Sequence, residues 1–91
     1  MINLIKKKLA DELLKYDLKL TNLEAGILKV QVLEYKEREA ELLNLIKNIE
    51  KDESVTKVIR NEGDVEIHFN QADILKPQTL TRWREIFKDY V

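Results

Sequence analysis

The sequence predicts an α+β domain in which helices pack on an antiparallel sheet, in the order α-β-β-α-β-β-α. Two observations lead to this prediction. In three separate stretches apolar residues recur every three or four positions, which is the period of an amphipathic helix. Between these stretches lie two segments in which apolar and polar residues alternate around a glycine, which is the pattern of a β-hairpin.

The first helix is expected over residues 2–16. Its apolar residues fall on one face at three- and four-residue spacing, and they are Ile2, Ile5, Leu9, Leu13 and Tyr16. The three lysines at residues 6–8 lie on the remaining faces. Because lysine is mostly a solvent-exposed residue, we interpret them as a solvated helix face rather than as a phosphate site.

Residues 17–34 allow two interpretations. The alternation in 18–21 and 28–32 around Gly26 favours a hairpin, which is the first choice. The alternative is a helix that places Leu20, Leu23, Ile27 and Val30 on one face, although its internal glycine and β-branched residues weaken it. Three helices followed by one hairpin would resemble a winged helix, so this segment decides between the two folds.

A second hairpin is expected from residues 55–60 and 64–70, which flank Asn61-Glu62-Gly63. We expect Gly63 to adopt a left-handed conformation in a three-residue loop, with Ile59 opposite Val65 and Val55 opposite Phe69. The opposite face of the hairpin would then pair Arg60 with Asp64.

Helices are expected on both sides of the second hairpin, over residues 35–52 and from Pro77 to about residue 90. The first has an apolar stripe made of Tyr35, Leu42, Leu43, Ile46 and Ile49. Proline suits the first turn of a helix, where its missing N–H leaves no bond unmade. The apolar stripe of the last helix consists of Leu80, Trp83, Phe87 and Tyr90.

One domain covers residues 1–91, because a chain of 91 residues has room for a single core and shows no recognisable linker or internal repeat. The absence of cysteine excludes disulfides and cysteine-ligated metals. The lysines follow a very short apolar run, the reverse of a signal peptide, and no apolar stretch approaches membrane-spanning length. We therefore expect a cytoplasmic protein without a membrane segment.

No catalytic, metal or cofactor site is predicted. Asp64, Glu66 and His68 alternate along one strand face, but polar alternation is typical of a solvated face, and residues two apart in a strand are about 7 Å apart. With one histidine and no cysteine, the chain shows no nucleophile motif, phosphate loop or dinucleotide fingerprint. The sequence therefore disfavours an enzyme.

Trp83 with its neighbours Arg82 and Arg84 is the candidate partner-binding set. Tryptophan and arginine are enriched among the residues that dominate interface energies. The competing interpretation, which we favour for Trp83 itself, is that it anchors the last helix in the core, because it lies on a wide apolar stripe.

We predict a non-catalytic protein-protein interaction module, such as a small intracellular regulator, accessory factor or inhibitor, which binds another protein or a second copy of itself. A phage or mobile-element protein that blocks a host enzyme would have the same features, because surface complementarity leaves no motif. The alternative is a winged-helix-like DNA-binding regulator. Nucleic acid is disfavoured, because the net charge is −1 and the segment that would be the recognition helix contains Glu37, Glu39 and Glu41.

Overall fold

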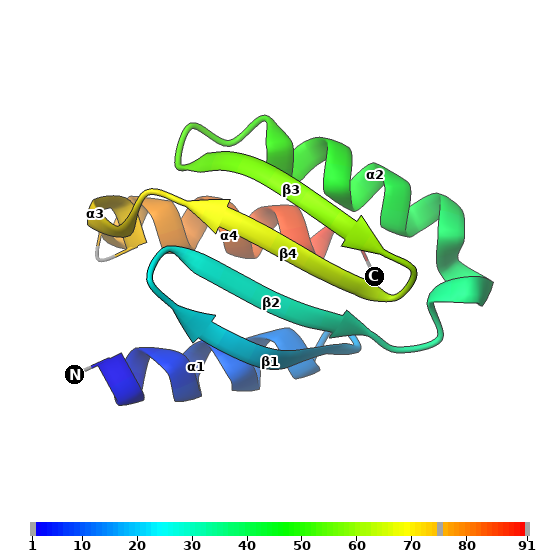
Figure 1. The fold of residues 1–91 in the computed structure, drawn as a ribbon, viewed down its shortest axis with the longest axis horizontal. Coiled ribbons are helices and arrows are strands. Elements are labelled where there is room, and N and C mark those ends of the chain that lie inside the picture. Colours follow the sequence, from blue (N-terminus) through cyan, green and yellow to red (C-terminus); the bar gives the residue numbers. More distant parts are fainter. Residues whose placement is uncertain (1, 75, 91) are drawn as a thin grey trace.

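The computed structural model describes the backbone of residues 2–74 and 76–90 and the side chains of residues 6–73 and 76–90. The chain forms a four-stranded antiparallel sheet with helices on one face (Figure 1). The strands are β1 (Leu18–Glu24), β2 (Ile27–Val32), β3 (Val55–Asn61) and β4 (Asp64–Phe69), in the spatial order β1-β2-β4-β3. The helices are α1 (Ile2–Leu14), α2 (Glu39–Glu50), α3 (Gln71–Ile74) and α4 (Pro77–Lys88), and the 3-10 helix η1 (Tyr35–Arg38) precedes α2. The predicted α+β fold is confirmed, with α3 as an added short helix.

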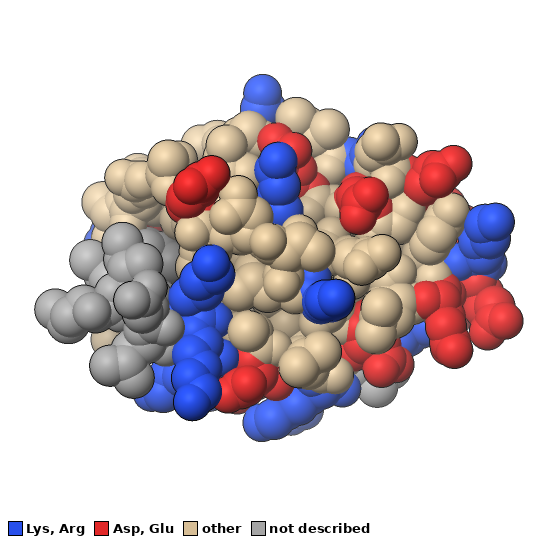
Figure 2. Space-filling view, turned by 60° about the horizontal axis from the view of Figure 1, so that its bottom comes forward, with Lys and Arg blue, Asp and Glu red and all other residues tan. Residues whose placement is uncertain are grey.

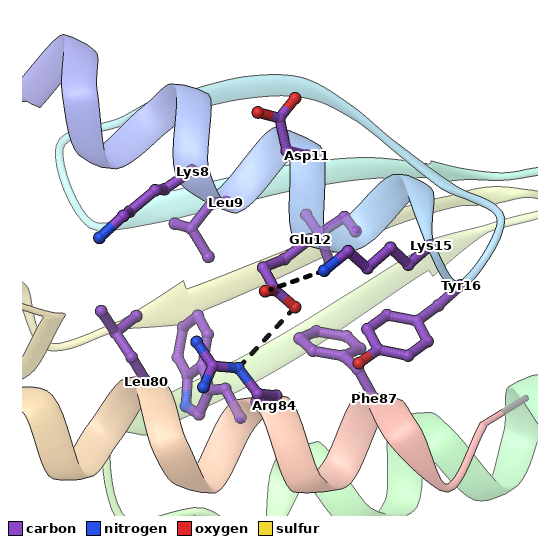
Figure 3. A pocket seen from close by; sticks show the side chains of 11 residues that line it. Lys8, Leu9, Asp11, Glu12, Lys15, Tyr16, Leu80, Arg84 and Phe87 are labelled. Carbon is purple, nitrogen blue, oxygen red and sulfur yellow. Dashed lines mark hydrogen bonds and ion pairs between the residues drawn. The ribbon is translucent and has the colours of Figure 1, made fainter.

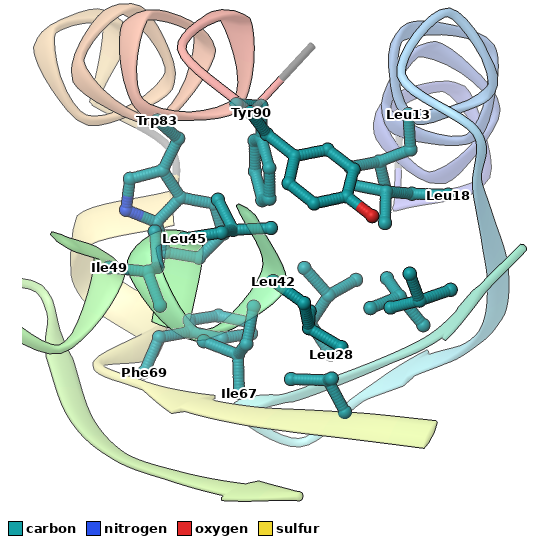
Figure 4. Packing of buried hydrophobic residues seen from close by; sticks show 14 residues of the cluster. Leu13, Leu18, Leu28, Leu42, Leu45, Ile49, Ile67, Phe69, Trp83 and Tyr90 are labelled. Atoms are coloured by element: carbon teal, nitrogen blue, oxygen red, sulfur yellow. The ribbon is translucent and has the colours of Figure 1, made fainter. Parts of the chain in front are cut away.

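The core lies between the inner face of the sheet and helices α1, α2 and α4 (Figure 4). Its helical contributors include Leu13 of α1, Leu42, Leu45 and Ile49 of α2, and Trp83 and Phe87 of α4. Trp83 is only 1% exposed and meets Phe69 edge-on with 5.6 Å between ring centroids. Its indole N–H donates a hydrogen bond to Ser54 Oγ at 2.9 Å. The core interpretation of Trp83 is therefore confirmed.

Residues 17–34 form the β1–β2 hairpin, so the winged-helix alternative for this segment is wrong. Two residues, Ala25 and Gly26, connect the strands with φ angles of 46° and 79°. Two consecutive positive φ values are typical of a type I′ turn, whose twist matches that of the flanking strands. Glycine is favoured at such a position because it has no Cβ to clash.

The β3–β4 hairpin forms as predicted, but its turn differs from the expected one. Asn61 pairs with Asp64, which leaves a two-residue connection in which Glu62, not Gly63, has a positive φ of 55°. Ile59 consequently lies opposite Glu66, not Val65, whereas an irregularity near the start of β3 restores the predicted pairing of Val55 with Phe69. A Cβ on Gly63 would lie 2.6 Å from Tyr35 Cδ1, so this glycine is required for space.

Arg60 is also placed differently from the prediction. It lies opposite Val65 on the helical side of the sheet and not beside Asp64. Its guanidinium forms two hydrogen bonds of 2.6 Å to the carboxylate of Glu39, at the start of α2. The shift of one residue in register moved Arg60 to the other face, which is the expected consequence of the two-residue period of a strand.

The ends of the helices also differ from the predicted ranges. α1 ends at Leu14, and Tyr16 lies in the turn that leads to β1. The predicted helix over 35–52 begins as the 3-10 helix η1, after Glu34 with a φ of 55°, and α2 ends at Glu50. The side chains of Ile2 and Ile5, predicted to extend the apolar stripe of α1, lie outside the described residues.

The chain contains two successive αββ units, α1-β1-β2 and α2-β3-β4, that the sequence did not reveal. The strands of the second unit begin at residues 55 and 64, each 37 positions after its counterpart at residues 18 and 27. The pairing of β2 with β4 is centred on Lys29 opposite Glu66, which are also 37 positions apart. The two units are thus arranged about an approximate two-fold axis through this pair. Among the described elements, α4 has no counterpart in the first unit.

Candidate functional site

A groove with a volume of about 400 Å³ lies between α1 and α4, on the helical side of the molecule (Figure 3). The two helices run side by side in the same direction, as Figures 1 and 3 show. Their apolar stripes face each other across the groove, with Leu9, Leu13 and Tyr16 on one wall and Leu80, Trp83 and Phe87 on the other. A volume of this size lies within the range of known ligand sites.

Aromatic rings close one end of this α1–α4 groove. The rings of Tyr16 and Phe87 stack with their centroids 6.5 Å apart and their planes inclined by 20°. The side chains of Tyr16 and Leu80 are partly exposed, whereas Trp83 and Phe87 are buried behind them. The groove thus has an apolar floor that the chain itself covers only in part.

The rim of the groove is charged. Lys8 extends from α1, Lys15 from the turn just after it, and Arg84 from α4 (Figure 3). Glu12 lies between them, with Oε2 3.8 Å from Arg84 Nε and Oε1 3.5 Å from Lys15 Nζ. Asp11 is also beside the groove, but its carboxylate points away from α4 in Figure 3. The charges that face the groove are therefore mainly positive.

The opposite side of α4 is fixed to the end of α2 by a buried polar cluster. The guanidinium of Arg82 donates to the two carboxylate oxygens of Asp52, from Nε at 3.0 Å and from Nη2 at 3.2 Å. The hydroxyl and backbone N–H of Ser54 donate to Asp52 Oδ1 at 2.6 and 3.0 Å. Burial acts to raise the pKa of the Asp52 carboxyl, but the hydrogen bonds from Arg82 and Ser54 outweigh it and hold this pKa at about 2.

Asp64, Glu66 and His68 all lie on the open face of the sheet, as the strand alternation predicted. His68 Nε2 is 2.7 Å from Glu66 Oε1, and Lys29 Nζ is 3.9 Å from Glu66 Oε2. Within residues 6–73 and 76–90, no group of three or more acidic or histidine side chains is placed to hold a metal ion. Glu66 is therefore occupied by a histidine and a lysine of its own sheet.

Neither the face shown in Figure 2 nor the two edge strands offers a clear surface to a partner. Figure 2 shows lysine, arginine, aspartate and glutamate residues interspersed over one face, without a continuous area of either sign. The two edge strands, β1 and β3, each contain a register irregularity in their pairing. Irregular edges are a recognised obstacle to the addition of a further strand. The winged helix considered for DNA binding does not form, because residues 18–32 are the β1–β2 hairpin.

The three predicted partner-binding residues fall in different surroundings. Arg84 is on the rim of the groove, and its side chain is 56% exposed. Trp83 contributes to the groove wall from a buried position, while Arg82 is on the other side of α4, bound to Asp52. The partner-binding role of these residues stays a prediction.

The α1 wall of the groove was not predicted. Leu9 and Lys8 are 71 and more positions before Leu80 in the sequence, and no local pattern indicates that their helices are neighbours. The only signal in the sequence is the wide apolar stripe of each helix. A stripe of this width can pack on the sheet with one part and border a groove with another.

Comparison with protein-family models, with curated proteins and with solved structures finds no match. Among the residues that the structure describes, no helix combines the length and the apolar composition that crossing a membrane requires.

Proposed function

We propose that the chain is a non-catalytic protein-binding module, acting as a small regulator, accessory factor or inhibitor, and that the α1–α4 groove receives a segment of another protein. The observation that supports this proposal is the apolar floor of the groove, which two helices border but do not cover. A groove between helices that exposes apolar side chains is a recurrent mode of peptide recognition.

The dimensions of the groove agree with this function. Leu9 of α1 and Tyr16, in the turn just after this helix, are seven residues apart, as are Leu80 and Phe87 on α4. At a rise of about 1.5 Å per residue, each wall presents roughly 10 Å of apolar surface. That length corresponds to about two helical turns of a bound segment.

A charge placed among the apolar residues that line the groove provides the test. We expect Leu80→Glu to weaken binding of a partner segment strongly, because the docked segment would bury a carboxylate against apolar side chains. Leu80 is only partly buried, so the variant should remain folded. The matched control is Leu43→Glu, since Leu43 is 55% exposed on α2 and does not line the groove.

The measurement starts from random 18-residue peptides displayed on phage and selected on the immobilised protein. Labelled synthetic copies of the selected peptides are then titrated by fluorescence anisotropy. We expect the parent and Leu43→Glu to bind alike and Leu80→Glu to bind at least about 10-fold more weakly, which corresponds to about 1.4 kcal/mol. If no selected peptide distinguishes Leu80→Glu from Leu43→Glu, the groove is not a protein-binding site and the proposal is wrong.

A further inference from the structure

Resting on the proposed function, we propose that the partner segment is an acidic amphipathic helix, and that one of its carboxylates replaces Glu12 as the partner of Arg84. Three features of the groove support this inference, namely the charge of its rim, the saturation of the backbone in its walls and the geometry of the Glu12–Arg84 pair.

The rim charge favours an acidic occupant. Lys8, Lys15 and Arg84 border the apolar floor, and Glu12 is the carboxylate that faces them (Figure 3). An apolar segment with basic residues would therefore meet charges of its own sign on both walls. Complementary charge across an interface attracts the correct partner and disfavours others.

The walls of the groove favour a helical occupant. Both walls are helices, whose central backbone N–H and C=O groups are already bonded within each helix. An extended segment docked there would find few free backbone groups to pair with, and its own buried ones would lack partners. A helix satisfies its own backbone and presents apolar side chains at positions i, i+4 and i+7, a spacing that suits the two-turn floor.

Glu12 is a weak internal partner for Arg84. Its separations of 3.8 Å from Arg84 Nε and 3.5 Å from Lys15 Nζ are longer than those of a strong charge-assisted hydrogen bond, about 2.7–2.9 Å. The Arg84 side chain is also 56% exposed, and a guanidinium carries five N–H donors.

The Glu12–Arg84 pair spans the groove from α1 to α4 (Figure 3). A helix that reaches the floor must therefore separate the two side chains. A carboxylate on that helix then restores a partner to Arg84, whereas a neutral or basic helix leaves Arg84 without one. Arg84 thus selects acidic partners, and Glu12 competes with them for its guanidinium.

The test uses the phage-selected 18-residue peptides that bind Leu80→Glu more weakly than Leu43→Glu, a control that carries the same added charge outside the groove. We expect them to carry an excess of Asp and Glu over Lys and Arg, with apolar residues at helical spacing. For a labelled acidic peptide from this set, Arg84→Gln should weaken binding by about 10-fold or more, the size expected for one charge-assisted hydrogen bond. Glu12→Gln should strengthen binding about 3-fold, because the competitor is removed. Lys88→Gln is the control, since Lys88 is exposed on α4 and does not line the groove.

The outcomes separate this inference from the proposed function. Groove-dependent peptides that are neutral or basic on average would overturn the inference and leave the proposed function standing. So would a Glu12→Gln variant that binds the acidic peptide more weakly than the parent. A selection that yields no groove-dependent peptide would overturn the proposed function, and the inference with it.

Discussion

The two sides of α4 are built in different ways. On the side of α2, the buried Asp52 accepts hydrogen bonds from Arg82, and Trp83 donates to Ser54. On the side of α1, the polar contact between the helices is the Glu12–Arg84 pair at 3.8 Å, above an apolar groove. The same helix therefore serves as an anchor on one side and as the wall of an open site on the other.

A further contact strengthens the side of α4 that is anchored to α2. Arg38, just before α2, donates from Nη2 to the backbone carbonyl of Tyr90 at 2.6 Å, and its guanidinium lies 4.0 Å from the centre of the Tyr90 ring. The position of α4 is thus set by the second αββ unit. Because these contacts hold α4 in place, the groove beside α1 of the first unit can stay open without loss of the packing of α4.

The largest expected effect comes from Trp83, which contributes to the groove wall from a buried position and is hydrogen-bonded to Ser54 on the anchored side. We predict that Trp83→Ala destabilises the protein by about 3–5 kcal/mol, through lost burial and the cavity that remains. Leu80→Ala, on the groove side of the same helix, should cost about 1 kcal/mol because Leu80 is already partly exposed. Thermal denaturation of both variants beside the parent measures the contrast. Similar melting temperatures for the two variants would show that the two sides of α4 do not differ in their contribution to stability.

A smaller effect, of about 2 kcal/mol, is expected from Asp52. Its carboxyl has a pKa of about 2 in the folded protein against a usual value of 3.8, so as the pH falls the unfolded chain takes up this proton first. The corresponding stabilisation is present above about pH 4 and is lost between about pH 4 and pH 2, at about 1.4 kcal/mol for each pKa unit.

Urea denaturation between pH 7 and pH 2 tests this dependence on Asp52. We expect Asp52→Asn to be less stable than the parent at pH 7 and to approach it as the pH falls to 2. Asp11→Asn, which removes an exposed carboxylate of α1, serves as the control and should follow the parent. A stability difference between Asp52→Asn and the parent that stays constant over this range would show that Asp52 does not anchor α4 through its charge.

The two hairpin glycines provide the smallest and most specific comparison. Gly26→Ala and Gly63→Ala should each cost about 1–2 kcal/mol, the first because its φ is 79° and the second because a Cβ would press on the ring of Tyr35. A double-mutant cycle with Tyr35→Ala separates the causes. Removing the ring should relieve the cost of Gly63→Ala and leave that of Gly26→Ala unchanged. Equal relief, or none, at the two positions would contradict this assignment.

The elements of the fold could be predicted because each is determined by neighbours in the sequence. The stripe of Leu80, Trp83 and Phe87 and the alternation around Gly26 are local patterns with a direct physical cause. The turn at Gly63 was predicted wrongly, because glycine is required there to leave space for the ring of Tyr35 and not to adopt a positive φ. Tyr35 belongs to a different element, η1. Sequence spacing alone does not show such a contact.

The groove and the two-fold arrangement could not be predicted for related reasons. Both depend on how distant elements pack, and the two hairpins share only Gly26 and Gly63 as identical residues at the spacing of 37. Positions 37 residues apart can share apolar character without being identical. Leu28 and Val65, for example, are both buried on a central strand. Many apolar sequences satisfy the same positions, so the units can resemble each other in structure while their sequences differ.

The one-sided attachment of α1 has a consequence for amide hydrogen exchange. Because an open groove separates much of α1 from α4, α1 can detach from the sheet in a local opening that needs less free energy than global unfolding. We therefore expect the amides of α1 to exchange faster than those of α2, which Arg38, Asp52 and Ser54 tie to the last helix. A segment bound in the groove would contact both helices. Its binding free energy would be added to the free energy needed to open α1. Protection of α1 would then rise with the concentration of the partner, which makes the exchange rate of one helix a direct measure of how much of the groove is occupied.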